Sequence, residues 1–328
     1  MTKVVFIWVG SGLPYYVNSS LEINLIHSNS DIVLVTNKRN EKMLSRRVLL
    51  SKRFSLVDSR EFEEEETGRL IESRVLTGGK DFRRGFWVNT LKRLFVLKKY
   101  AERYGAGFFH AELDNVLFSL DRLEKQISSL SHSEFFVRDR EDRAVLSIAY
   151  FKTVAGLKRL CEHIEGTNSE EVVNDMYIVG SYMKSNPGTS ISLPNEVAFS
   201  KAQWPQVAPS QILGICDANA VGQFIAGLDF YISNRLFNRF VNENAQCRLQ
   251  DCRFIGKTLD TGGFKLQVEN GGIVYDLYNI HVHSKVLWWL RWKWSTSIIL
   301  FMVNKGYRLP FISIGAVKER LRSKLGYE

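Results

Sequence analysis

Short apolar runs rich in β-branched residues alternate with segments of helical periodicity, and this alternation restricts the fold more than any other feature. Residues 3–9 (KVVFIWV) and 31–37 (DIVLVTN) are typical of buried strands, and residues 15–29 between them are typical of a helix. Residues 87–105 have apolar side chains at helical spacing and end in glycine, and the apolar run over 107–118 predicts a strand that follows directly. The alternation predicts an α/β fold with a mainly parallel sheet flanked by helices.

The pattern continues through the second half of the chain. Residues 143–151 (RAVLSIAYF) are typical of a strand, and residues 153–166 are typical of a helix that ends in glycine. Residues 262–285 predict two strands joined by a turn and closed by a His-x-His-Ser-Lys run.

Composition and cysteine spacing narrow the class of protein. The 328 residues are 45% hydrophobic and 24% charged, as in ordinary globular proteins. The four cysteines show no C-x-x-C spacing, which argues against a zinc site or a disulfide framework. The first residues read as a strand rather than a secretory signal. We therefore expect a reducing, cytoplasmic setting.

The net charge of +9 is unevenly distributed. From His281 to the last residue the chain has nine Lys or Arg residues and two acids, which accounts for +7 of that charge. The first 280 residues are nearly neutral. The basicity therefore belongs to the tail, and we expect no nucleic-acid-binding face on the main domain.

Two acids, Glu112 and Asp114, lie within the otherwise apolar run "FFHAELDNVLF" at 108–118. Carboxylates are rarely buried unless they are paired or bind a cation, and ligands bind at strand ends in open α/β sheets. If both acids lie on one strand they point the same way, as a hard-oxygen site for Mg²⁺ or Mn²⁺ would need. Asn115 would add a hydrogen bond to a sugar or phosphate oxygen. The simpler alternative is that the two acids cap a turn.

Several segments together resemble GT-A-fold (Rossmann-like) nucleotide-sugar glycosyltransferases, in particular bacterial transferases of capsule and lipopolysaccharide. In chain order these are VVFIWVGSGLPYYVNSSL (4–21), NTLKRLFVLKKYAERYG (89–105), FFHAELDNVLF (108–118), SIAYFKTVAGLKRL (147–160), ICDANAVGQFIAGLDF (215–230), VNEN (241–244) and IHVHSK (280–285). The resemblance implies a D-x-D metal motif, in which Glu112 stands where the first Asp is usual. It implies a nucleotide diphosphate sugar, most often UDP-linked, as donor.

The same resemblance implies a division of the chain. Residues 1–285 would form the catalytic domain, with a nucleotide-binding half to about residue 120 and an acceptor half over 121–285. Residues 286–328 would form a C-terminal helical extension.

The resemblance also implies roles at the metal. Asp114 would bind Mn²⁺ or Mg²⁺ directly, and Glu112 would reach the ion through water or bind the ribose. His283 would complete the metal shell, although His281 lies on the same strand face and is the open alternative. Lys285 would neutralise charge on the leaving diphosphate, or it is a surface lysine.

Four further residues are candidates for donor binding. Arg93 would contact the diphosphate, or it forms an ion pair with Glu102 or a surface acid. Trp8, with the loop that begins at Gly10, would stack on the nucleobase, or it is a core residue. Asn37 would read the edge of the base, or it shapes a turn.

The catalytic base is open on the sequence. An inverting transfer needs a carboxylate that removes the acceptor hydroxyl proton, whereas a retaining transfer does not. Asp175 is the first candidate, because the resemblance places an acid there, and Asp217 and Glu243 are its rivals.

Residues 285–311 are rich in tryptophan, arginine and lysine. Charged and hydroxyl residues interrupt the apolar pattern, so a membrane-spanning helix is not expected. Tryptophans with flanking cations are typical of an element that lies on an anionic membrane surface. The alternative is a helix packed on the catalytic domain or on a second subunit. Membrane contact would suit a lipid-linked glycan acceptor at the cytoplasmic leaflet.

Two other functions fit parts of the pattern. A nucleotidyl- or phosphotransferase would also use paired acids and a divalent ion, but its Gly-rich phosphate loop should carry a basic residue, which "GSGLPYY" lacks. A non-catalytic membrane-associated scaffold would show no metal-dependent nucleotide binding.

Overall fold

The computed structural model describes most of the chain. The described residues are 1–62, 70–71, 85–118, 120–140, 142–167, 174–195, 214–226, 249–258, 264–291 and 293–305. The candidate base Glu243, the motif at 241–244 and the tail beyond residue 305 lie outside them.

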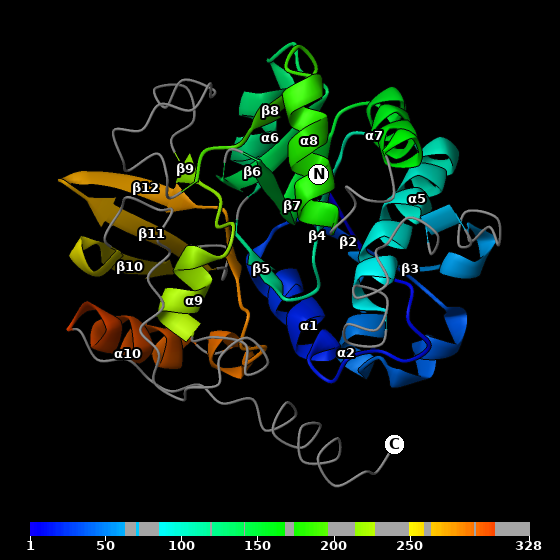
Figure 1. Cartoon of the computed structure of the whole chain (residues 1–328). Coiled ribbons are helices and arrows are strands. Elements are labelled where there is room, and N and C mark those ends of the chain that lie inside the picture. Colours follow the sequence, from blue (N-terminus) through cyan, green and yellow to red (C-terminus); the bar gives the residue numbers. More distant parts are fainter. Residues whose placement is uncertain are drawn as a thin grey trace, which may run out of the picture.

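Within the described residues, a seven-stranded sheet in the order β3-β2-β1-β4-β7-β6-β8 forms the centre of the fold (Figure 1). Neighbours β3, β2, β1 and β4 are parallel, as are β6 and β8, whereas β7 runs antiparallel to both of its neighbours. This confirms the predicted α/β fold with a mainly parallel sheet. The strands are β1 (Lys3–Trp8), β2 (Asp31–Thr36), β3 (Phe54–Asp58), β4 (Phe108–Ala111), β6 (Glu134–Arg140), β7 (Arg143–Phe151) and β8 (Ser190–Ser192).

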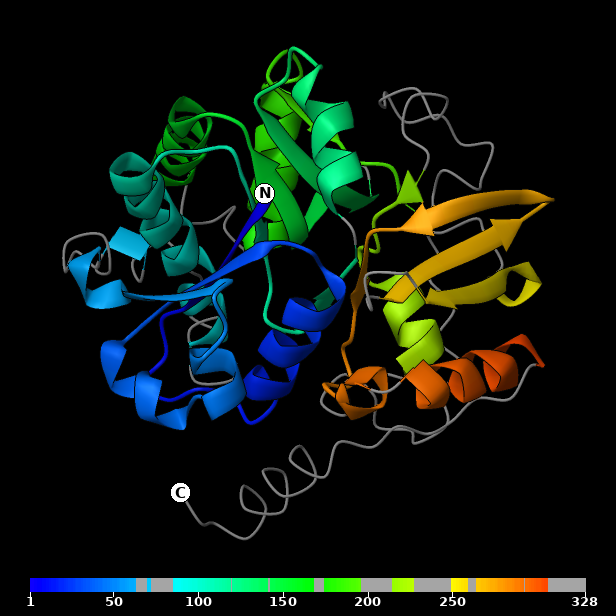
Figure 2. The same cartoon turned by 180° about the vertical axis from the view of Figure 1, so that it is seen from behind.

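Helices cover both faces of this sheet, because alternate side chains of each strand point to opposite faces. In β1, Val4 and Phe6 pack against the side that holds α1, α2 and α6, whereas Val5 and Ile7 pack against α5, α7 and α8. Figure 2 shows the molecule from behind, with the side that holds α1, α2 and α6 toward the viewer. The helices are α1 (Val17–His27), α2 (Arg46–Leu49), α5 (Phe86–Tyr104), α6 (Leu120–Ser128), α7 (Val154–Gly166) and α8 (Asp175–Ser185), with short 3₁₀ turns η1 (Lys38–Met43) and η2 (Ser59–Glu61).

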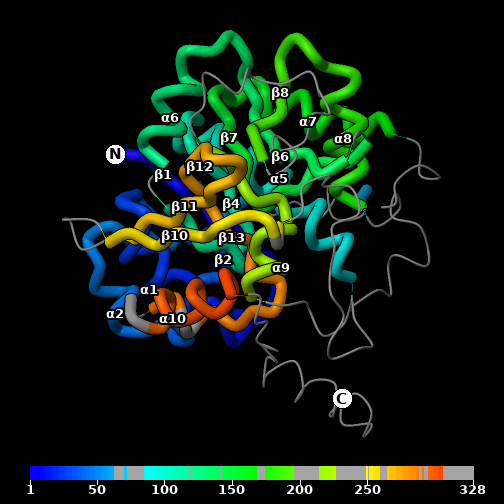
Figure 3. The backbone as a smooth tube through the Cα atoms, turned by 90° about the vertical axis from the view of Figure 1, so that its left-hand side faces the viewer, coloured from blue at the N-terminus to red at the C-terminus, as the bar shows by residue number. Residues whose placement is uncertain are grey.

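A second, four-stranded sheet in the order β10-β11-β12-β9 lies beside the first (Figure 1). Helix α10 packs under β10 (Figure 3). The expected pair of strands joined by a turn is confirmed as β11 and β12. The elements here are β9 (Gly214–Ile215), α9 (Ala220–Ala226), η4 (Leu249–Asp251), β10 (Arg253–Thr258), β11 (Phe264–Asn270), β12 (Ile273–Leu277), η5 (Trp288–Arg291) and α10 (Lys293–Asn304).

The beginning of the expected C-terminal extension is built into this second region. Leu287, Leu290 and Leu300 are buried in the same hydrophobic cluster as Val116 and Phe118 of the first half of the chain. The expected boundary between residues 285 and 286 therefore falls inside a hydrophobic core. Among the described helices, none combines the length and the apolar character that crossing a bilayer requires.

The expected continuous strand over 107–118 is wrong. It divides into β4 and β5 (Asn115–Leu117), and β5 pairs antiparallel with β13 (Asn279–His281). At the break, the Asn115 amide donates to the Glu112 carbonyl at 3.0 Å, which closes a turn over residues 112–115. The chain leaves the main sheet here because β13, from far along the sequence, supplies a new pairing partner.

Candidate metal and donor site

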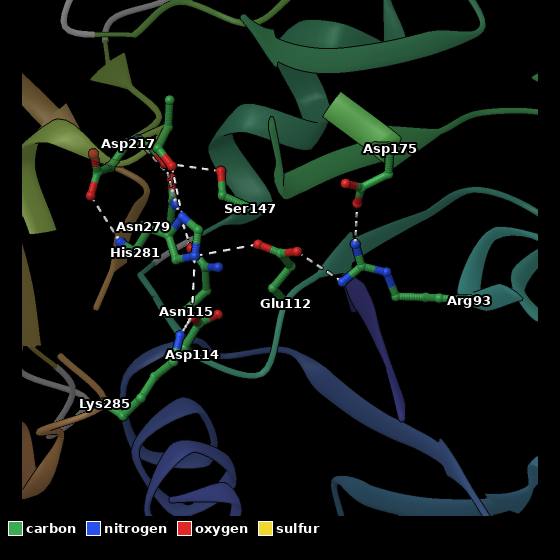
Figure 4. Close-up of polar contacts among 11 residues, drawn as sticks. Arg93, Glu112, Asp114, Asn115, Ser147, Asp175, Asp217, Asn279, His281 and Lys285 are labelled. Carbon is green, nitrogen blue, oxygen red and sulfur yellow. Dashed lines mark hydrogen bonds and ion pairs between the residues drawn. The ribbon is translucent and has the colours of Figure 1, made fainter. Parts of the chain in front are cut away.

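Three side chains with metal-ligating atoms converge where the chain leaves β4. Glu112 and Asp114 come from the turn between β4 and β5, and His281 is the last residue of β13. Their ligand atoms all lie within 4.8 Å of one another (Figure 4). His281 Nε2 lies 3.2 Å from Asp114 Oδ2 and 3.3 Å from Glu112 Oε2. The carboxyl end of a strand in an open α/β sheet is the edge at which such folds bind ligands.

The other ring nitrogen determines what His281 offers to the two acids. Nδ1 lies 2.7 Å from the Ala218 carbonyl oxygen, which only accepts, so Nδ1 carries the proton and donates it. In the neutral imidazole, Nε2 then has a lone pair that faces two carboxylate oxygens. Three electron-rich atoms this close repel one another unless a positive charge, a proton or a metal ion, lies among them.

The spacing fits a divalent ion. Two bonds of about 2.1 Å at a right angle hold their donor atoms about 3 Å apart, close to the distances from His281 to both acids. Two carboxylates and one imidazole are also a suitable donor set for Mn²⁺, because imidazole nitrogen suits Mn²⁺ better than Mg²⁺. Glu112, Asp114 and His281 could therefore hold such an ion.

Two cations flank the three residues. The Lys285 ammonium pairs with Asp114 Oδ2, and Arg93 Nη1 donates to Glu112 Oε1 at 2.9 Å. Arg93 Nη2 donates to Asp175 Oδ2 at 3.1 Å, so one guanidinium joins the acid of the turn to the first residue of α8 (Figure 4). A cation therefore lies on the far side of each of the two acids, and Asp175 lies beyond Arg93.

This arrangement shifts two carboxyl groups in opposite directions. Burial raises the pKa of Glu112, but the charges of Arg93 and His281 outweigh burial and hold that pKa below its ordinary value. Burial raises the pKa of Asp175 to about 6, although the charge of Arg93 lowers it in part. Glu112 is therefore a carboxylate at neutral pH, and the pKa of Asp175 lies closer to neutrality than that of an ordinary aspartate.

The structure brings His281, rather than His283, to the two acids. β13 ends at His281, and the His283 amide donates to the His281 carbonyl at 3.1 Å. His283 therefore lies in the turn after the strand, and the expectation that both histidines share one strand face is wrong. The two rings pack against each other with centroids 4.1 Å apart. Glu112 and Asp114 still face one point as expected, but through a turn rather than through strand alternation.

Arg93 and Asn115 have partners that the sequence did not predict. Arg93 is buried between two acids of the site, and Glu102 pairs instead with Lys99 at 3.7 Å. Asn115 is fully buried beneath the turn, and its Oδ1 accepts a hydrogen bond from Asn279 Nδ2 at 2.7 Å. The Asn115 side chain therefore joins β5 to β13 instead of facing a sugar.

The candidates for the nucleobase lie at the ends of β1 and β2. The Trp8 ring is partly buried and its Nε1 donates to the Gly12 carbonyl at 2.7 Å. A Cβ at Gly10 would lie 2.6 Å from that ring nitrogen, so the loop passes the indole only with glycine there. Asn37 caps η1 by accepting from the Arg39 amide at 3.0 Å, which is the turn role. Base stacking on Trp8 stays a prediction.

The structure also distinguishes the two described candidates for the catalytic base. Asp175 contacts the site through Arg93, whereas Asp217 is fully buried and accepts hydrogen bonds from backbone amides around α9.

Asn279 and the Ala218 carbonyl were not identified from the sequence. Asn279 belongs to β13, and the Ala218 carbonyl accepts a hydrogen bond from the His281 ring. A backbone carbonyl cannot be recognised from residue types. Asp217, which precedes α9, was the residue that drew attention to this segment.

No protein-family model matches the chain, and no curated protein matches it. Among solved structures it is similar to mouse xyloside xylosyltransferase 1 (6% identity, 59% of this chain and 85% of that one, TM-score 0.40). It is also similar to the glycosyltransferase GlyE of Streptococcus pneumoniae (12%, 60% and 46%, TM-score 0.39) and to an active-site mutant of LgtC (12%, 64% and 81%, TM-score 0.37). These likenesses are distant.

Proposed function

We propose that the protein is a divalent-metal-dependent glycosyltransferase. It moves a sugar from a nucleotide diphosphate sugar, most simply a UDP-sugar, to a hydroxyl of a glycan or lipid-linked glycan in surface-polysaccharide synthesis. One observation carries the proposal: Glu112 Oε2, Asp114 Oδ2 and His281 Nε2 face one another at the carboxyl end of β4, with cations on either side. A site of this kind suits a diphosphate and its counter-ion.

Glu112, Asp114 and His281 would hold Mn²⁺ or Mg²⁺, and the bound ion would supply positive charge to the diphosphate. Lys285 adds a second positive charge beside Asp114, where it can stabilise the charge that develops on the leaving group. Lys285 also has a left-handed backbone conformation, with φ of 59°, which is uncommon for a residue other than glycine. Such a conformation persists where the surrounding structure imposes it, as at a functional turn.

Asp175 would act as the base if the transfer inverts the anomeric centre. Its pKa of about 6 leaves it ionised at neutral pH and still basic enough to accept the acceptor hydroxyl proton. Arg93 holds its Oδ2 at 3.1 Å and so fixes the side chain relative to Glu112. In a retaining transfer, Asp175 would have only the structural role of pairing with Arg93.

We place the reaction at the cytoplasmic face of a membrane. Ile298 and Phe301 of α10 are 51% and 62% exposed, and the Lys305 ammonium lies 5.9 Å from the Phe301 ring. Apolar side chains next to a cation suit contact with anionic lipid. Such contact would bring a lipid-linked acceptor to the enzyme.

A donor screen tests the proposal. Purified protein is incubated with a panel of nucleotide sugars, with Mn²⁺, with Mg²⁺ or with a chelator, and nucleoside diphosphate release is measured beside the melting temperature with UDP and Mn²⁺. We expect metal-dependent cleavage of at least one donor and a higher melting temperature with UDP and Mn²⁺. No cleavage and no shift would overturn the proposal. Pyrophosphate release from nucleoside triphosphates would favour a nucleotidyltransferase instead.

A further inference from the structure

Asp217 is a fully buried carboxylate that the proposed reaction does not use. Its Oδ1 accepts from the Val221 amide at 2.9 Å, and its Oδ2 accepts from the amides of Gly222 at 2.7 Å and His281 at 2.9 Å. Two of these donors belong to the first turn of α9 and the third belongs to β13. One carboxylate therefore fastens the start of a helix to the strand that carries the histidine of the site.

The backbone of Asp217 is held just as closely. Asn279 Oδ1 accepts from the Asp217 amide at 2.9 Å, and the Asp217 carbonyl accepts from Asn279 Nδ2 at 2.9 Å and from Ser147 Oγ at 3.0 Å. The residue after Asp217 supplies the carbonyl to which His281 Nδ1 donates. The position of that carbonyl is therefore set by Asp217 and its partners.

The helix and the strand approach so closely that only glycine fits between them. A Cβ added to Gly222 would lie 2.0 Å from the His281 carbonyl oxygen and 3.0 Å from Asp217 Oδ2. Backbone contact at this range leaves the His281 backbone little freedom to shift. The ring of His281 is then oriented by a rigid frame rather than by solvent.

We propose that Asp217 is a positioning residue for the metal site: through the amide of His281 and the carbonyl of Ala218 it fixes the imidazole with Nδ1 protonated and Nε2 toward Glu112 and Asp114. This inference rests on the proposed function for its purpose, but the orientation of the ring can be measured without any metal. Partners that orient a ligating histidine typically change metal affinity about 10–100-fold when they are removed.

Asp217→Asn is the first test, because an amide presents an NH₂ group where the carboxylate accepts from a backbone amide. Mn²⁺ binding is followed by the loss of the free-ion EPR signal, and folding is checked by the melting transition. We expect binding to weaken about 10–100-fold. Glu134→Gln is the matched control. Glu134 is also a fully buried carboxylate, it pairs with Arg159 of α7, and its variant should bind Mn²⁺ like the unaltered protein. A folded Asp217→Asn protein whose affinity stays within about twofold of the control overturns the inference.

Ser147→Ala tests the positioning role of Asp217 if Asp217→Asn does not fold. It removes one hydrogen bond to the Asp217 carbonyl without changing any charge, so a loss of affinity cannot come from a missing negative charge. We expect Mn²⁺ binding to weaken about fivefold, as one hydrogen bond would predict. Unchanged binding in this variant would count against Asp217 as a positioning residue.

Imidazole ¹⁵N NMR of the metal-free protein separates this inference from the proposed function. The shifts of Nδ1 and Nε2 distinguish the two neutral tautomers and the imidazolium, and His281→Gln assigns the signals by their absence. If Asp217→Asn and Ser147→Ala move the His281 signals and Glu134→Gln does not, the positioning role holds even if the protein binds no Mn²⁺. If the His281 signals stay unchanged in both variants, the positioning role is wrong, whatever the metal data show.

Discussion

Nε2 of His281 lies 3.2 Å from Oδ2 of Asp114, so the end of β13 and the turn after β4 deliver their side chains to one point. The strand register explains the meeting. β13 pairs with β5 so that His281 lies opposite Asn115, the residue next to Asp114. A slip of one residue would send the imidazole to the other face of the pair.

Asp114→Asn should remove metal-dependent donor cleavage. The change keeps the size of the side chain but removes the charge that faces His281 and Lys285, and we expect a loss of at least about 100-fold in kcat/KM, because a bound ion contributes several kcal/mol to such reactions. Nucleoside diphosphate release with and without Mn²⁺ measures it. Glu162→Gln on α7, an acid 57% exposed, is the control and should retain full activity. Metal-stimulated cleavage by Asp114→Asn at the control rate would mean that the ion binds elsewhere.

His281→Gln and His283→Gln distinguish the two histidines. Because His281 Nε2 faces both acids and its Nδ1 is tied to the Ala218 carbonyl, we expect His281→Gln to weaken Mn²⁺ binding about 100-fold and His283→Gln to weaken it less than about threefold. EPR titration of both variants is the measurement. The reverse order would show that His283 binds the ion and that the ring contact between the two histidines rearranges on binding.

Arg93→Met should destabilise the protein. The substitution leaves two acids, Glu112 and Asp175, without the guanidinium between them, and breaking a buried ion pair by removing one partner costs about 3–5 kcal/mol. Urea unfolding measures the loss. Arg103→Met, which breaks an exposed pair with Glu61, is the control and should cost at most about 1 kcal/mol. If both variants lose the same stability, Arg93 does not organise the site.

A triple variant without the charges of Arg93, Glu112 and Asp175 tests whether the lost stability comes from unpaired carboxylates. Arg93→Met combined with Glu112→Gln and Asp175→Asn leaves no uncompensated charge among these residues, so we expect most of the lost stability to return. A triple variant as unstable as Arg93→Met alone would point to lost packing rather than to unpaired carboxylates.

In an inverting transfer, kcat/KM should fall as the pH drops below about 6. Burial raises the pKa of Asp175 to about 6, and only its ionised form accepts a proton, so the rate should decrease about tenfold for each pH unit below that value and level off above it. The Asp175→Asn variant should have a low kcat/KM at every pH and should not show this decrease below pH 6. A limb near pH 6 that persists in the residual activity of Asp175→Asn would assign it to another group. Product NMR gives the anomeric outcome independently.

Ile298→Ser combined with Phe301→Ser should weaken binding to anionic vesicles without unfolding the protein. Both side chains are exposed on α10, whereas truncation after Lys285 would also remove Leu287 and Leu300 from the core and would confuse the result. Sedimentation with anionic and neutral vesicles measures binding. The control is Ile273→Ser with Val274→Ser, an exposed apolar pair on β12. Equal binding by both double variants would remove α10 as the contact.

The strands and helices that depend on local side-chain pattern could be predicted from the amino-acid sequence. The apolar runs at 3–9 and 31–37 predicted β1 and β2, and the helical spacing over 87–105 predicted α5, because side-chain periodicity follows from local backbone geometry. The sequence also singled out Glu112 and Asp114, since two acids at the end of an apolar run need compensation wherever they lie.

The partners that compensate those acids come from tertiary contacts and could not be predicted from the sequence. The choice of His281 over His283 and the hydrogen bonds of Asp217 depend on the pairing of β5 with β13 and on the approach of α9. The bridge of Arg93 between Glu112 and Asp175 depends on the packing of α5 beside α8. These contacts join residues far apart in the chain, so no local pattern encodes them. They form because buried hydrogen-bonding groups and charges must find partners wherever the fold brings them together.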